Sequence, residues 1–217
     1  MSQSLPGLWD PDASAPRDGA FRTDLAHELG HGVVARHFGI TVSSITLRGL
    51  AVGDGFIRVS GGCSTDWWAH PWQPPWDLAV VSAAGPVAES LERNEDPLRD
   101  PLALMQSSTE FAGDLEDLLA AIGLHHHVPA TDSPAYVPIA VRDAYGIVKD
   151  RLPRMRALIE SYEDTVLTSG ATTFDIPWDD ELTRSFPNID RTCVPMVFGE
   201  STSSAATPRL VYPSATS

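Results

Sequence analysis

The segment His27-Glu28-Leu29-Gly30-His31 has residue types and a spacing that suit hydrolysis at a metal ion. On a helix, side chains four residues apart project from one face, so His27 and His31 can share one ion. Neutral imidazole is a favoured ligand of zinc, and a catalytic zinc keeps an open position for water. Glu28, next to the first ligand, can take a proton from that water and return it to a leaving amine. The segment therefore predicts a zinc site that hydrolyses peptide bonds, with Glu28 as general base.

A catalytic zinc of this kind needs a third protein ligand. His37 stands at the last position of the longer pattern H-E-x-x-H-x-x-G-x-x-H, which needs a glycine at position 34. This chain has Val34, a β-branched residue that fits a left-handed turn poorly. If the helix continues, His37 points about 120° away from His31, because each residue turns about 100°. We therefore expect His37 to lie outside the site.

Three other positions remain open as the third ligand. Glu89 lies on a predicted helix, as in zinc peptidases whose third ligand is glutamate. Asp114 is a second carboxylate, in the segment 111–116. The run His125-His126-His127 could also bind a metal, although such a run is more often a solvated loop. Spacing alone does not rank these three candidates.

The composition argues against polyanionic partners. The 217 residues carry a formal net charge of −14, from 29 acidic and 15 basic residues. Phosphate backbones and anionic lipids repel such a chain, so we expect no nucleic-acid partner and no membrane-surface role. No stretch approaches the roughly 18 apolar residues of a membrane span, and residues 1–20 lack a secretory pattern. We therefore expect no membrane segment and a cytoplasmic location.

The pattern of apolar residues predicts a mainly α fold with a small β-hairpin or sheet (α+β). We expect helices over 23–37, 76–93, 108–122 and 135–168, strands over 40–50 and 56–59, and irregular chain over 61–75 and 124–134. Gly39 is placed to end the first helix. One domain over 20–198 is expected between a flexible arm, 1–19, and a disordered tail, 199–217.

Two sets of side chains receive no firm role from the sequence. Cys63 and Cys193 lie far apart and have no metal-knuckle spacing, which leaves a single bridge between them open. Aromatic side chains gather in one segment and suit a partner interface, a lid or core packing: Trp67, Trp68, Trp72 and Trp76.

Five segments, in this order, resemble the peptidase domain of the FtsH-type membrane proteases, the M41 family of zinc peptidases. Residues 24–35 (DLAHELGHGVVA) resemble the family's zinc helix, and 44–53 (SITLRGLAVG) resemble its strand with an arginine-glycine turn. Residues 81–89 (VSAAGPVAE) are similar to its A-G-R-A-A-E-E helix. Residues 108–121 resemble the stretch with the family's third ligand, and 141–182 resemble its long C-terminal helix and closing segment.

The resemblance implies a zincin-like HExxH helix in an M41-type helical domain, with His27, His31 and Asp114 as zinc ligands. Asp114 falls on the aspartate of a motif like (A/S)-x-N-D-L, with Gly113 where the family usually has asparagine. Without an ATPase to unfold its targets, such a domain is expected to cleave an unfolded protein or peptide substrate, which could add as a strand to an unpaired edge near Ile45.

The chain departs from the family in having no ATPase motif G-x-x-x-x-G-K-[ST]. The leading hypothesis is therefore an ATP-independent zinc endopeptidase, with any partner ATPase and the oligomeric state left open. The alternatives are another zincin with Glu89 as third ligand, and a degenerate or zinc-stabilised M41-like module for protein interaction. The intact Glu28 favours an enzyme, since a structural zinc needs no general base.

Overall fold

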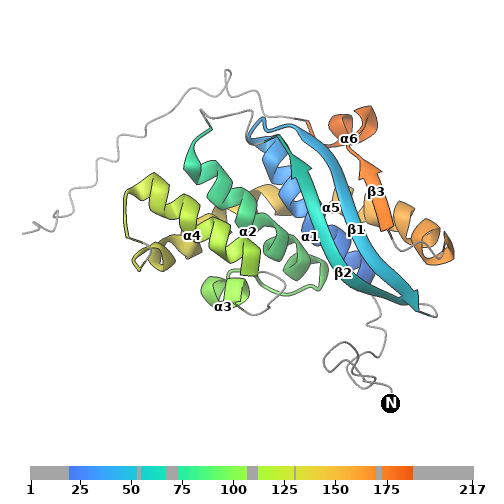
Figure 1. The fold of residues 1–217 in the computed structure, drawn as a ribbon, viewed down its shortest axis with the longest axis horizontal. Helices are drawn as coiled ribbons and strands as arrows, with labels where there is room; N and C mark the ends of the chain where they lie inside the picture. Colours follow the sequence, from blue (N-terminus) through green and yellow to red (C-terminus); the bar gives the residue numbers. More distant parts are fainter. Residues whose placement is uncertain are drawn as a thin grey trace, which may run out of the picture.

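The computed structural model describes residues 20–52, 55–66, 73–106, 112–129, 131–169 and 173–187. These residues are mainly helical with one three-stranded antiparallel sheet, so the predicted α+β class is confirmed (Figure 1). The predicted arm 1–19 and tail 199–217 lie outside the described residues, as do Trp67, Trp68, Trp72 and Cys193. Within the described ranges, no helix is both long and apolar enough to cross a membrane.

The elements follow one another along the chain as α1 (Ala20–His37), β1 (Val42–Val52), β2 (Gly55–Thr65), α2 (Pro75–Glu92), α3 (Pro101–Gln106), α4 (Ala112–His126), η3 (Ser133–Tyr136), α5 (Val137–Ser169), β3 (Thr173–Pro177) and α6 (Asp180–Ser185).

Helix α1 is buried on almost all sides because it contacts the sheet, α2 and α5 (Figure 1). Between positions 24 and 35 every residue is buried except His31. The helix ends as predicted at Gly39, which has a φ of +81°. The amides of Gly39 and Ile40 donate to the carbonyls of Arg36 and Ala35, the hydrogen bonds of a Schellman cap.

Helix α2 packs against α1 at unusually short range. A Cβ atom added to Gly30 of α1 would lie 2.7 Å from the Cβ of Ala88 on α2, so no side chain fits there. Residues 79–90 of α2 are all buried, and this helix also contacts α4 and α5. Burial of a side chain such as Leu25 or Leu29 stabilises the fold by roughly 1.5–3 kcal/mol. The apolar core thus fixes α2 between α1 and α4.

Strand β1 is the central strand of the sheet, whose order is β2-β1-β3. Ile45 is paired on both sides, with Cys63 of β2 and with Ile176 of β3. The predicted unpaired edge near Ile45 is therefore wrong, because β3 occupies it. Among the described residues no strand pairs with the outer edge of β2.

Several predicted boundaries are also wrong. The second strand continues to Thr65, although the sequence predicted irregular chain from position 61. Its Ser and Gly residues give no periodic signal, and pairing with β1 determines its course. Helix α4 continues to His126, where the sequence predicted a loop, and His126 stacks on Tyr136. The sequence did not predict the short elements α3, η3, β3 and α6.

Candidate metal site

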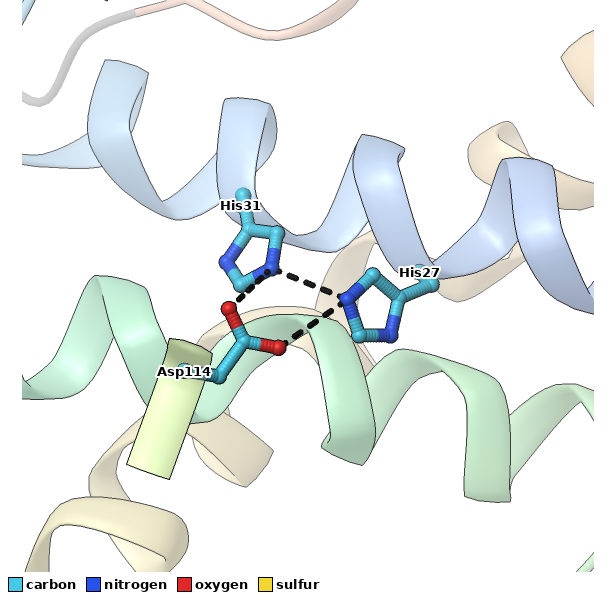
Figure 2. A group of neighbouring side chains, drawn as sticks. All are labelled: His27, His31 and Asp114. Carbon is cyan, nitrogen blue, oxygen red and sulfur yellow. Dashed lines mark hydrogen bonds and ion pairs between the residues drawn. The ribbon is translucent and has the colours of Figure 1, made fainter. Parts of the chain in front are cut away.

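Three predicted ligands, His27 and His31 of α1 and Asp114 of α4, meet at one point (Figure 2). The Nε2 atoms of the two histidines are 3.2 Å apart. Asp114 lies 3.1 Å from His27 through Oδ2 and 3.4 Å from His31 through Oδ1. One ligand atom from each residue lies within 4.8 Å of the others. The predicted trio is therefore brought together, although Asp114 comes 83 positions after His31.

The separation of the two imidazole nitrogens fits a shared metal ion. Zinc binds histidine nitrogen at about 2.0–2.1 Å in tetrahedral geometry, which separates neighbouring ligand atoms by roughly 3.3 Å. The observed 3.2 Å between His27 Nε2 and His31 Nε2 agrees with that separation. Two nitrogen lone pairs and a carboxylate that face one another form a suitable donor set for a divalent cation.

The other ring nitrogen of each histidine contacts an acceptor. His31 Nδ1 is 2.7 Å from the carbonyl oxygen of Val81, which can only accept, so Nδ1 carries the proton. His27 Nδ1 lies 3.3 Å from Oε2 of Glu89, which also forms an ion pair with Arg93. The Val81 carbonyl fixes the tautomer of His31 and leaves its Nε2 unprotonated for a metal. The Glu89 carboxylate favours the same tautomer of His27 once a metal replaces the proton on its Nε2. Glu89, one candidate third ligand, thus contacts the nitrogen of His27 that faces away from Asp114.

Gly85 of α2 lies directly against both imidazoles. A Cβ atom there would lie 2.7 Å from His27 Nε2 and would overlap His31 Nε2. Only glycine lets the two rings lie this close to α2. A glycine inside a helix destabilises it by up to about 1 kcal/mol relative to alanine. A glycine at such a position therefore indicates that another group approaches the backbone closely. Gly85 belongs to segment 81–89, which resembles a helix of the M41 family, but that resemblance does not indicate its contact with the imidazoles.

The electrostatics of the trio favour a bound cation. Burial lowers the pKa of His27, but its contacts with Asp114 and Glu89 outweigh burial and raise the pKa to about 9. Burial raises the pKa of Asp114, but the charge of His31 and contacts with both histidines hold it well below its usual range. Asp114 is therefore ionised. A metal ion and a proton compete for the Nε2 atom of His27, which faces this carboxylate.

A pocket of about 290 Å³ opens onto the trio. Strand β2 lines it with Gly61, Gly62 and Cys63, and the start of α4 lines it with Asp114. Glu28, only 3% exposed, also lines this pocket, so the predicted base shares one space with the predicted ligands. Cys63 has a free thiol whose pKa is raised by burial and by the charge of Glu28. Cys193, with which the sequence left a bridge open, lies outside the described residues.

The remaining candidate histidines lie elsewhere. His37 is within 3.5 Å of Arg151 on α5, away from the trio, as expected. His125 and His126 each lie 5.4 Å from Trp76 between ring centroids. In the described part of the chain, the His27, His31 and Asp114 group is the metal-binding cluster that the geometry supports. His125 and His126 thus lie against aromatic rings, and His127 is exposed just after the end of α4.

Comparisons with protein-family models, with curated proteins and with solved structures find no match to this chain. The M41 resemblance therefore stays a prediction from the five sequence segments. The interpretation of the site depends on its own geometry.

Proposed function

We propose that this chain is an ATP-independent, M41-like zinc endopeptidase that cleaves unfolded proteins or peptides. One observation carries the proposal: two imidazole Nε2 atoms 3.2 Å apart meet the Asp114 carboxylate in a pocket that also contains buried Glu28. Two histidines and one carboxylate with an open position suit a catalytic zinc. A structural zinc site would need neither the open pocket nor the base.

The residues of the chain have distinct roles in this mechanism. Zinc, when held by His27, His31 and Asp114, supplies Lewis acidity and a lowered pKa for water. Glu28 accepts the proton of the attacking water and donates it to the amine that leaves. Glu89 and the Val81 carbonyl hold the two imidazoles in place through their Nδ1 atoms.

The outer edge of β2 is the proposed place for the substrate backbone. This strand lines the pocket, and no described strand pairs with its outer edge. An extended segment that adds to such an edge bonds through its main chain, which requires an unfolded substrate. This location replaces the edge near Ile45 that the sequence suggested. A cytoplasmic location belongs to the same proposal and depends on the sequence alone.

The test of the proposed function compares wild type with Glu28→Gln on a denatured protein substrate. Zinc content is measured in both proteins by elemental analysis. We expect equal zinc and a loss of cleavage of about 100-fold or more in the variant, because the base is gone. If both proteins hold zinc and neither cleaves, the proposal is wrong and the protein-interaction module is favoured.

The choice of third ligand is tested separately. Asp114→Asn and Glu89→Gln each remove one carboxylate charge without changing side-chain size greatly. We expect zinc to be lost in the Asp114 variant and only weakened in the Glu89 variant. The opposite result would support a zincin with Glu89 as its third ligand.

A further inference from the structure

The charged residues that line the site pocket are all acidic or histidine. Three carboxylates line it, those of Glu28, Asp114 and Asp117, and no lysine or arginine does so among the described residues. The proposed mechanism uses Glu28 as base and Asp114 as ligand. Asp117 has no role in that chemistry, and its charge faces the space that a substrate would enter.

Asp117 lies three positions after Asp114 on α4, so the two side chains share one face of the helix. Asp117 is exposed, and its side chain has no hydrogen bond or ion pair within the part of the chain that the structure describes. Partial burial and the negative charges of Asp114 and Glu116 raise its pKa, and the charge of the nearby His31 offsets only part of that rise. A cation beside Asp117 would relieve this repulsion.

The pocket has room for a long side chain near this carboxylate. Gly62 of β2 and Gly113 of α4 both line the pocket, from different elements. A Cβ atom at either glycine would have nothing within 4 Å, so the space beside each is open. Lysine and arginine have flexible stems that can lie along such a space while the charged end reaches a carboxylate.

We propose that Asp117 makes the site selective for substrates with a lysine or arginine side chain next to the scissile bond. This inference rests on the proposed peptidase function and names its substrate class. An ion pair at a partly exposed site is weak, so the expected preference for lysine over glutamate is about three- to tenfold in kcat/KM. The preference should shrink as salt is raised, because salt screens exposed charges.

The experiment uses the zinc-loaded full chain and matched peptides that differ at one position flanking the scissile bond, with lysine, glutamine or glutamate there. The readout is the ratio of kcat/KM for the lysine and glutamate peptides within each protein, so that a general loss of activity cancels. We expect a ratio of about three to ten at one flanking position in wild type. Asp117→Asn should bring the ratio close to one, and Asp117→Lys should invert it.

Glu116→Gln is the matched control, because Glu116 is a neighbouring acid on α4 that does not line the pocket. Its ratio should stay close to that of wild type. Binding of the same peptides to zinc-loaded Glu28→Gln provides a second measurement that needs no turnover. Equal cleavage of lysine and glutamate peptides by wild type, or a ratio that Asp117→Asn leaves unchanged, overturns the inference and leaves the peptidase intact. A wild type that cleaves no peptide overturns the peptidase itself.

Discussion

The two histidine pairs of this chain, His27 with His31 on α1 and His125 with His126 on α4, have opposite surroundings. The first pair meets carboxylates, and its Nε2 atoms converge to 3.2 Å. The second pair consists of adjacent residues, which turn about 100° apart on a helix. Its rings pack on aromatic side chains, and His126 stacks on Tyr136 at 3.9 Å.

The pKa values follow the same contrast. Carboxylate contacts outweigh burial and raise the pKa of His27 to about 9, whereas burial and the nearby His125 lower that of His126. The comparison teaches that histidine content does not define a metal site. A spacing of four on one helix, together with a carboxylate from a second helix, is what separates the α1 pair from the α4 pair.

The strongest way to break this comparison is to remove one histidine from each pair. We expect His27→Ala to abolish stoichiometric zinc binding, because a catalytic zinc site has only three protein ligands to hold the ion. His126→Phe, which keeps a ring for stacking on Tyr136, should retain the full zinc content. Elemental analysis after dialysis measures both. Zinc that persists in the first variant, or disappears from the second, would contradict the assignment.

Gly85 provides a test that leaves every ligand in place. Gly85→Ala introduces a methyl group against both imidazoles, so we expect zinc affinity to fall at least 100-fold and the folded state to be destabilised. Gly146→Ala on α5 is the matched control, since a Cβ there meets nothing within 4 Å. That variant should be neutral or up to about 1 kcal/mol more stable. Competition with a chromogenic chelator measures the affinity. An unchanged zinc affinity in Gly85→Ala would refute this role of Gly85.

A smaller effect on zinc affinity is expected at Glu89, whose carboxylate contacts Nδ1 of His27, the ring nitrogen that faces away from Asp114. Loss of such an outer contact typically weakens metal binding by about 10- to 100-fold. We expect Glu89→Gln to fall in this range, measured by the same competition assay. Glu95→Gln, an exposed acid just beyond α2, should show no change. Complete loss of zinc in Glu89→Gln would mean that this carboxylate is a direct ligand.

The titration of His27 gives the last prediction, for chelator-treated protein. The pKa of His27 is about 9 in the folded protein and 6.5 ordinarily, so its protonation stabilises the folded state. This contribution is complete below pH 6.5 and is lost as the pH rises through 9. We expect the free energy of unfolding to fall by about 1–3 kcal/mol over that window, measured by urea titration. His27→Asn should remove this fall, whereas His126→Phe should keep it. A flat profile in wild type would contradict the raised pKa.

The features that could be predicted from the sequence are those determined by residues close together in the chain. Helix α1, its end at Gly39 and the pairing of His27 with His31 all follow from residues within a few turns of one another. Asp114 was only one of several candidates until the family resemblance favoured it. Its position depends on α2, which packs between α1 and α4.

The errors have the same origin. The edge near Ile45 was predicted to be open because β3 lies beyond the long helix α5, where no local signal connects the two strands. The role of the Val81 carbonyl could not be predicted at all, since a backbone oxygen leaves no mark in a sequence. Asp117 could have been found by noting an acid one turn after a candidate ligand.

The position of Asp114 on a different helix from the histidines has a mechanical consequence. An ion bound by His31 and Asp114 would close a loop of 83 positions in the chain. If such a bond acts on the unfolded chain as a covalent cross-link does, it reduces the entropy of unfolding by an amount worth about 4–5 kcal/mol. The bound ion would then cross-link α4 to α1, the two helices between which α2 packs. Binding of the ion and the packing of α4 against α2 would therefore stabilise each other.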